Sequence, residues 1–250
     1  MLLQGLLVRV GIDLSEKGGK WNSRVDLQSG EFIYMPIPGG RDEPHVHGLK
    51  RGYEELISSL KKFGDAHGKD IYKDWEFPKK LLSRDMHLDP DFEYLSYGDL
   101  AKRGKKLTEL KEGDFIAFYS SFKPISPPEK PLYYALVGFY KIQEIVCPID
   151  VLEDRRKENA HTRILERRKT DIIVRGEPGE SARLDKCILI GERRDNAYRV
   201  MKNVEDCWGG LCVKNGFLQR SGSPPFFKDP EKFLRWFSDQ EVSLIQKNNP

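Results

Sequence analysis

The sequence has few cysteines and contains none of the short motifs that mark the commonest enzyme classes. No pair among Cys147, Cys187, Cys207 and Cys212 has the Cys-x-x-Cys spacing of a zinc site, and four cysteines are too few for a disulfide framework. The Gly-Gly-Lys at 18–20 lacks the spacing of a P-loop, which disfavours binding of a nucleoside triphosphate. Gly-x-Gly-x-x-Gly, Gly-x-Ser-x-Gly and His-Glu-x-x-His are also absent, which disfavours the enzyme classes that they mark.

Long apolar runs are missing as well. The first residues, MLLQGLLVRVGID, are apolar at their start, but they lack the charged region and cleavage site of a signal peptide and are too short to span a bilayer. We therefore expect reduced thiols, no membrane association and a cytoplasmic location. Asn and Gln are scarce beside Lys, Arg and Glu, a bias typical of thermophile proteins.

The sequence also lacks a large excess of positive or of negative charge. The net charge is +3 over 250 residues, although 32% of the residues are charged. A nucleic-acid surface must therefore come from local clusters of basic residues. Two such clusters occupy residues 101–111 and 155–169. Each is either a phosphate-binding face or an ordinary solvated surface, and both interpretations stay open.

The chain does contain enough apolar sequence to fold. Hydrophobic residues make up 38%, and we expect a single domain over 1–250, with a subdivision into 1–84 and 85–250 as the alternative. Patterns typical of strands and of helices predict an α+β fold. The strand patterns lie at 6–13, 30–38, 115–122, 132–145, 171–176 and 186–192, and the helical patterns at 51–64 and 229–246. We predict that 115–122 and 132–145 pair antiparallel across the proline-rich segment 124–131.

Five segments carry a resemblance to a known family. They are VRVGIDLSEKGGKWNS…GEFIYMPIP, HLDPDFEYLSYGD, GDFIAFY…YALVGFY, AHTR and DIIVRG…SARLDKCILIGE. In this order they resemble the nucleotide-modification-associated domain of the third type over most of the chain. The resemblance implies a link to the alteration or handling of nucleobases, and it supplies no catalytic residues. The segment EGDFIAFYSSF…LVGFYKI is similar to the core hairpin of PUA-like and EVE-like barrels, which bind RNA or modified bases, and it implies a central PUA-like mixed or antiparallel β-barrel with flanking helices.

The stretch HLDPDFEYLSYGD, residues 87–99, is the candidate catalytic segment. Alternate residues of an extended chain share a face, so His87, Asp89 and Asp91 are predicted to converge. Pro90 disfavours a helix and supports an extended or turned chain. An imidazole beside carboxylates suits general acid–base catalysis. The alternative is a turn in which the Asp side chains accept hydrogen bonds from backbone amides.

Further residues are predicted to bind the substrate. Tyr97 is expected to stack on a base, and an arginine beside a hydroxyl is expected to hold a phosphate. The alternative for Asp99 is a helix N-cap, and the alternative for each arginine is a surface ion pair. The predicted set is Tyr97, Asp99, His161, Arg163, Ser181 and Arg183. We predict no metal and no cofactor, because a structural zinc site needs four well-spaced ligands. His45 and His47 have a spacing that can chelate a metal, and a flexible loop is the alternative there.

The resulting hypothesis is that the protein handles a nucleotide or a nucleobase in nucleic acid, in connection with base modification. Its partner is predicted to be DNA, RNA or a free nucleotide. A binding module that reads modified bases without any chemistry is the alternative, and a protein-binding scaffold is a third. Whether the protein is an enzyme stays open at this point.

Overall fold

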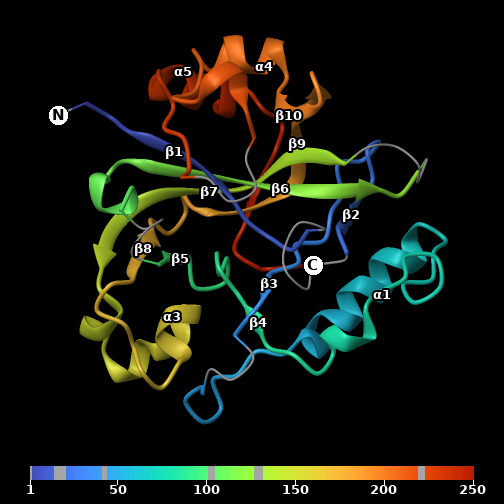
Figure 1. Ribbon diagram of the computed structural model, residues 1–250, viewed down its shortest axis with the longest axis vertical. Coiled ribbons are helices and arrows are strands. Elements are labelled where there is room, and N and C mark those ends of the chain that lie inside the picture. Colours follow the sequence, from blue (N-terminus) through green and yellow to red (C-terminus); the bar gives the residue numbers. More distant parts are fainter. Residues whose placement is uncertain (1, 14–20, 41–43, 101–104, 127–131, 219–222) are drawn as a thin grey trace.

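The computed structural model describes residues 2–13, 21–40, 44–100, 105–126, 132–218 and 223–250, and it confirms the α+β class (Figure 1). The strands are β1 (Gly5–Arg9), β2 (Ser23–Val25), β3 (Ile37–Pro38), β4 (Met86–His87), β5 (Ser96–Asp99), β6 (Phe115–Pro124), β7 (Tyr133–Val146), β8 (Ile172–Gly176), β9 (Ala182–Arg194), β10 (Ala197–Val200) and β11 (Leu244–Ile245). The α-helices are α1 (Ile57–Ala66), α3 (Ala160–Arg163), α4 (Lys202–Cys207) and α5 (Pro230–Ser238). Short 3-10 helices are η1 (Tyr53–Leu56), η2 (Lys79–Leu81), η3 (Leu107–Glu109), η4 (Pro148–Asp150), η5 (Glu153–Glu158) and η6 (Lys214–Gly216).

A nine-stranded mixed sheet forms the middle of the molecule, and β3 and β4 pair separately. Strands β6 and β7 are antiparallel, with Phe115 opposite Lys141 and Phe122 opposite Tyr133, which confirms the predicted pairing of these two segments. Strands β1 and β2 lie parallel to β6, one after the other along the same edge.

The strands that the structure describes do not close into a barrel, so the expected PUA-like barrel is not confirmed. The reason lies in β7, whose far edge is divided between two partners. Its first part, from Tyr134 to Phe139, pairs with β9, and its second part, from Ile142 to Val146, pairs with β8. Register shifts interrupt both pairings, and such bulges bend a strand and increase its twist. The sheet therefore branches into β8–β5 and β9–β10 instead of returning to its first strand.

Alternating side chains give the sheet two apolar faces. Along β1, Leu6 and Val8 belong to one buried cluster, whereas Leu7 belongs to the other. The cluster of Leu7 also contains Trp208 and Phe233, from the region of α4 and α5. Figure 1 shows α4 and α5 on one side of the sheet, with α1, α3 and the β3–β4 pair on the other. The sheet thus separates the layer of α4 and α5 from an irregular layer that contains the β3–β4 pair and residues 87–95, and β5 continues from that layer into the sheet.

The helices follow local signals closely. Helix α5 begins at Pro230, and the Asp229 side chain accepts a hydrogen bond from the Lys232 amide at 3.0 Å, as expected for an N-cap. Helix α1 runs past Gly64, which lies within the helix and not at its end. Among the residues described, no helix has both the length and the apolar character needed to cross a membrane.

The C-terminal segment crosses from the sheet to the irregular layer. Strand β11 pairs with β9, and the residues after it bind buried backbone. The Asn248 side chain accepts a hydrogen bond from the amide of Phe92 at 2.8 Å. The Asn249 side chain accepts one from the amide of Tyr34 and donates one to its carbonyl, each at 2.8 Å. These bonds hold the chain around residue 92 against the centre of the fold.

Candidate functional site

A cavity of about 720 Å³ lies in the irregular layer. Its wall is formed by the end of β1 and the turn after it, by β3, β4 and β5, and by residues 160–168. The polar residues that line it are Arg9, Asp13, His87, Asp89, Tyr97, Asp99, His161, Glu166, Arg167 and Arg168. Its volume falls within the range of small-molecule sites, about 300–1,000 Å³. Segments that lie far apart in the sequence, between residues 9 and 168, therefore meet at one cavity.

His161 is the most precisely held of these residues. It lies in α3, where the side chain of the N-cap Asn159 accepts a hydrogen bond from the His161 amide at 2.9 Å. Its Nδ1 lies 2.7 Å from Asp171 Oδ2, and its Nε2 lies 3.4 Å from Asp89 Oδ2. Burial opposes the charged imidazole, but the adjacent carboxylates of Asp171 and Asp89 outweigh it and raise the pKa of His161 to about 9. The ring is therefore fixed in orientation by one carboxylate and directed at another.

Asp89 is buried, and its two oxygens have different surroundings. Oδ1 lies 2.8 Å from the amide of Gly98 and 3.3 Å from Asn159 Nδ2, and it accepts a hydrogen bond from each. Oδ2 lies between the two imidazoles, 3.4 Å from His161 Nε2 and 3.7 Å from His87 Nε2. Burial raises the pKa of Asp89, while the nearby imidazole of His161 opposes that rise.

His87 completes a compact cluster. It lies in β4, opposite Ile37 of β3, and its side chain is about one quarter exposed at the cavity. Its ring meets that of His161 edge to face, with centroids 4.9 Å apart and planes at 79°. Two imidazoles and one carboxylate therefore gather at one place, which we call the His87–Asp89–His161 cluster.

Gly98 is part of this arrangement although it has no side chain. A Cβ atom at this position would lie 2.5 Å from His161 Cδ2 and 3.0 Å from Asn159 Oδ1. The first distance is shorter than real Cβ contacts and the second is at their lower limit, so any side chain at residue 98 would displace the imidazole. The neighbouring Tyr97 donates a hydrogen bond from its hydroxyl to Asp99 Oδ2 at 3.1 Å. Both Tyr97 and Asp99 line the cavity, and their role in binding a substrate stays a prediction.

Asp91 does not join His87 and Asp89, in contrast to the predicted convergence. The backbone of Asp91 pairs with that of Ser96 through two hydrogen bonds, of 2.8 and 3.1 Å, so the chain turns and the alternation of an extended strand ends there. Asp91 Oδ1 accepts hydrogen bonds from the Glu93 amide and from Asn248 Nδ2, each at 3.0 Å. The capped turn, which was the alternative interpretation, therefore describes Asp91.

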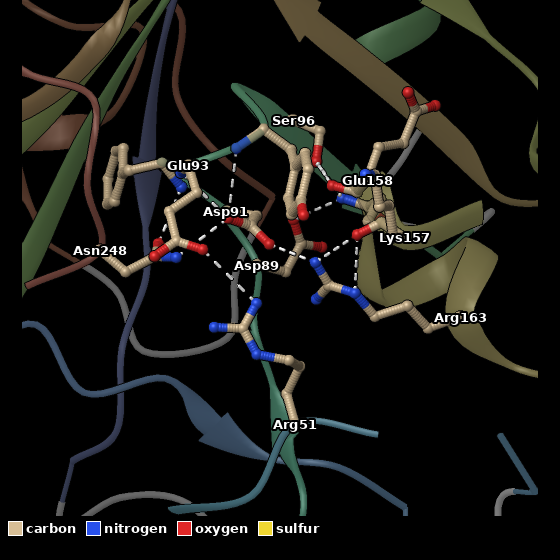
Figure 2. Close-up of polar contacts among 12 residues, drawn as sticks. Arg51, Asp89, Asp91, Glu93, Ser96, Lys157, Glu158, Arg163 and Asn248 are labelled. Carbon is tan, nitrogen blue, oxygen red and sulfur yellow. Dashed lines mark hydrogen bonds and ion pairs between the residues drawn. The ribbon is translucent and has the colours of Figure 1, made fainter. Parts of the chain in front are cut away.

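Arg163 is directed away from the cavity as well. Its guanidinium forms a fully buried ion pair with Asp91 Oδ2 and also donates to the carbonyl of Lys157 (Figure 2). Arg163 and Asp91 are thus bound to each other, and neither lines the cavity. This contact leaves the Arg163 guanidinium engaged within the protein and unsuited to the expected phosphate binding.

Ser181 and Arg183 are also outside the cavity lining. The Ser181 hydroxyl donates to the carbonyl of Lys141 and accepts from its amide, at 3.1 and 3.0 Å, which anchors the start of β9. The Arg183 guanidinium is buried over the ring of Phe32, 4.9 Å from its centroid, and burial lowers the pKa of Arg183 to about 10. We therefore do not include them in the candidate site.

The basic cluster at 155–169 is largely bound to neighbouring acids. Arg155 pairs with Glu158, and Arg167 pairs with Glu153, both at 3.0 Å. Arg156 pairs with Glu153 as well, at 3.2 Å. Arg168 is exposed, and with Arg167 it brings positive charge to the cavity edge. In the other cluster, residues 101–104 lie outside the described residues, and the Lys106 ammonium donates to the carbonyl of Pro224 at 2.7 Å.

Sequence reasoning missed several residues that shape the site. Asp171 has no local signal, because it reaches His161 only after the chain has turned from α3 into β8. Gly98 appears in the sequence as a single glycine, and its close contact with an imidazole is visible only in three dimensions. Asn159, by contrast, carries the N-cap signal of a short helix in the sequence Asn-Ala-His-Thr-Arg.

Comparison with known proteins identifies the family of the chain. The family model described as nucleotide modification associated domain 3 matches residues 4–209, which include every residue of the cavity lining. No curated protein and no solved structure matches the chain.

Proposed function

The chain belongs to the nucleotide modification associated domain 3 family, and we propose that its cavity binds a nucleotide whose base is then modified at the His87–Asp89–His161 cluster. One observation carries this proposal. His161 Nε2 is buried at the cavity, where its nearest acceptor is Asp89 Oδ2 at 3.4 Å, and it forms no hydrogen bond of ordinary geometry with the residues that the structure describes. Leaving a buried polar atom without a hydrogen bond costs about 1–3 kcal/mol, so such an atom indicates a group held for a ligand or a reaction.

The surroundings of the cluster agree with a nucleotide as the ligand. Tyr97 and Asp99 supply a ring and a carboxylate oxygen to the wall, which suit the face and the amino groups of a base. Arg168, exposed at the edge, supplies a positive charge for the phosphate. The base would thus lie inward and the phosphate at the edge, which suits a free nucleotide or one nucleotide of a strand.

The fixed orientation of the side chains in the cluster favours an enzyme over a reader of modified bases. A reader needs a complementary surface, whereas here one imidazole is oriented by Asp171 and directed at the buried Asp89. Perturbed ionisable groups that face a cavity are typical of catalytic sites. His161 is therefore held with its Nε2 directed at the cavity, beside the place where a base would lie.

Binding of nucleoside monophosphates and short single strands tests the function directly. Calorimetric titration would be carried out in the presence of a chelator, on the wild type, Arg168→Ala and Arg235→Ala. Arg235 is an exposed arginine of α5, on the other side of the sheet, and serves as the matched control. We expect binding by the wild type and the control, with a loss of at least tenfold in Arg168→Ala. Wild-type protein that binds none of these ligands, or equal binding by all three proteins, would refute the proposed function.

A change in the ligand distinguishes the enzyme from the reader. Mass spectrometry of nucleosides after incubation with the protein should reveal a new mass for the wild type but not for His161→Gln. Tight binding without any new mass in the presence of divalent metals and cellular extract would instead favour the reader.

A further inference from the structure

The His87–Asp89–His161 cluster has a composition that suits a metal ion. Each of the three residues offers one ligand atom, and these atoms all lie within 4.8 Å of one another. We propose that His87 Nε2, Asp89 Oδ2 and His161 Nε2 coordinate one divalent ion of the first transition row. For its role in the chemistry this inference rests on the proposed function, but binding of the metal requires no nucleotide.

The first argument is the orientation of Asp89. Its Oδ1 already accepts hydrogen bonds from the Gly98 amide and the Asn159 side chain. Oδ2 is left facing the two histidines, at 3.4 and 3.7 Å from their Nε2 atoms. A carboxylate held in this way presents one oxygen in a fixed direction, as a monodentate ligand does.

The second argument is the orientation of His161. Its Nδ1 lies 2.7 Å from Asp171 Oδ2, which leaves Nε2 as the atom directed at the cavity. Histidines that bind metals usually donate the other ring N–H to a carboxylate or a carbonyl, and this fixes the ring and raises its basicity. His161 Nε2 is also the atom that lacks a hydrogen-bond partner within the described part of the chain.

The third argument is distance. Metal–nitrogen and metal–oxygen bonds of about 2.1 Å place two neighbouring ligands about 3.0 to 3.4 Å apart, from octahedral to tetrahedral geometry. The observed separations of 3.4 and 3.7 Å are within a few tenths of an ångström of those values. The ligand atoms of the two imidazoles lie within 4.8 Å of each other, so metal binding requires a rotation of the partly exposed His87 side chain toward His161.

The ligand types and the charge select the class of ion. Two imidazoles and one carboxylate suit zinc, iron, cobalt or manganese, whereas magnesium and calcium prefer oxygen ligands alone. Two buried carboxylates, Asp89 and Asp171, flank His161 and favour a cation there. All three ligands line the cavity, so the remaining coordination positions would face the bound nucleotide, as in catalytic sites with three protein ligands.

This inference differs from the expectation of no metal. That expectation depended on ligands with a regular spacing in the sequence, and His161 comes from a segment far from His87 and Asp89. The pair His45 and His47, which does have a chelating spacing, gathers no third ligand among the described residues. His47 therefore provides a matched control, since it is an exposed histidine outside the cavity lining.

Cobalt(II) titration of metal-stripped protein, without nucleotide, tests the proposal. Visible absorption and elemental analysis would be measured for the wild type, His87→Ala, Asp89→Asn, Asp171→Asn and His47→Ala. We expect one cobalt per chain, with ligand-field bands, for the wild type and His47→Ala, and at least a hundredfold weaker binding for His87→Ala and Asp89→Asn. Asp171→Asn should weaken binding by about 10–100-fold, because it disturbs only the orientation of His161.

Thermal melting of the metal-free proteins supplies the folding control. Added cobalt should raise the melting temperature of the wild type and His47→Ala more than that of the other three variants. Wild-type protein that takes up no cobalt, or His87→Ala and Asp89→Asn variants that bind it as tightly as the wild type, would overturn the proposal. Loss of the metal in His47→Ala would move the site to the 45–47 loop and overturn it too. Nucleotide binding without metal binding would refute this inference alone, whereas metal binding without nucleotide binding would refute only the proposed function.

Discussion

Replacing Asp91 by Asn should destabilise the fold strongly, because Asp91 is the fully buried partner of Arg163. The substitution leaves the guanidinium of Arg163 buried without its counter-charge. Breaking a buried ion pair by removal of one partner costs about 3–5 kcal/mol. For a chain of this size, each kcal/mol lowers the melting temperature by about 2–4 °C, so the expected decrease is about 6–20 °C.

Urea unfolding and thermal melting would measure this effect beside two comparisons. Asp206→Asn removes the acid of an exposed ion pair with Lys202, and such pairs contribute only about 0–1 kcal/mol. His87→Ala removes a partly exposed ring at the cavity and should melt close to the wild type. We therefore expect the wild type, Asp206→Asn and His87→Ala to have similar stability, and Asp91→Asn to be much less stable than all three.

The double variant Asp91→Leu with Arg163→Met separates the ion pair from the turn. Apolar replacement of both members of a buried pair is often neutral or stabilising, so the double variant should be more stable than Asp91→Asn. An Asp91→Asn protein that melts within 2 °C of the wild type yet no longer binds its ligand would refute this reasoning and return Asp91 to the functional site.

Three further predictions follow from contacts already described. Gly98→Ala should lower the affinity for cobalt by at least tenfold and the free energy of unfolding by about 1–3 kcal/mol, because the added methyl group overlaps the ring of His161. A cobalt titration that gives the same affinity for this variant and the wild type would contradict the prediction. Asp229→Ala should lower the free energy of unfolding by about 0.5–2 kcal/mol in urea, since it removes the N-cap of α5, and no change would show that the cap is dispensable. The affinity of Arg168→Ala for a single-stranded oligonucleotide should depend less on salt than that of the wild type. The slope of log affinity against log salt concentration should be smaller in magnitude by about 0.7, which is the contribution of one phosphate contact. An unchanged slope would show that Arg168 does not contact a phosphate.

The elements that depend on local signals were predictable from sequence. The apolar runs at 115–122 and 132–145 specify β6 and β7, and Asp229-Pro230 specifies the start of α5. The branching of β7 was not predictable, because it depends on register shifts against strands far along the chain. One apolar strand pattern is compatible with a barrel and with a branched open sheet.

The same division applies to the site. His87 and Asp89 are two residues apart, and their proximity follows from a short extended segment. Asp91 has the same spacing from Asp89, yet the turn to Ser96 directs it to Arg163. The alternation of side chains along an extended segment does not predict which carboxylate pairs with a buried guanidinium, because the guanidinium belongs to another segment of the chain. The role of Asp171 beside His161 depends in the same way on the packing of α3 next to β8.

The C-terminal segment has a consequence for where this domain ends as a folding unit. The family match stops at residue 209, but Phe227 and Phe233 belong to one buried core and β11 to the sheet. Asn248 and Asn249 also satisfy buried amides at Phe92 and Tyr34. The segment needed for cooperative folding is therefore longer than the segment that matches the family model. A fragment cut at the last matched residue would retain the whole cavity lining yet lose Leu211, Leu218, Phe227 and Phe233 from a buried cluster. It should therefore expose apolar surface and aggregate before it could bind any ligand.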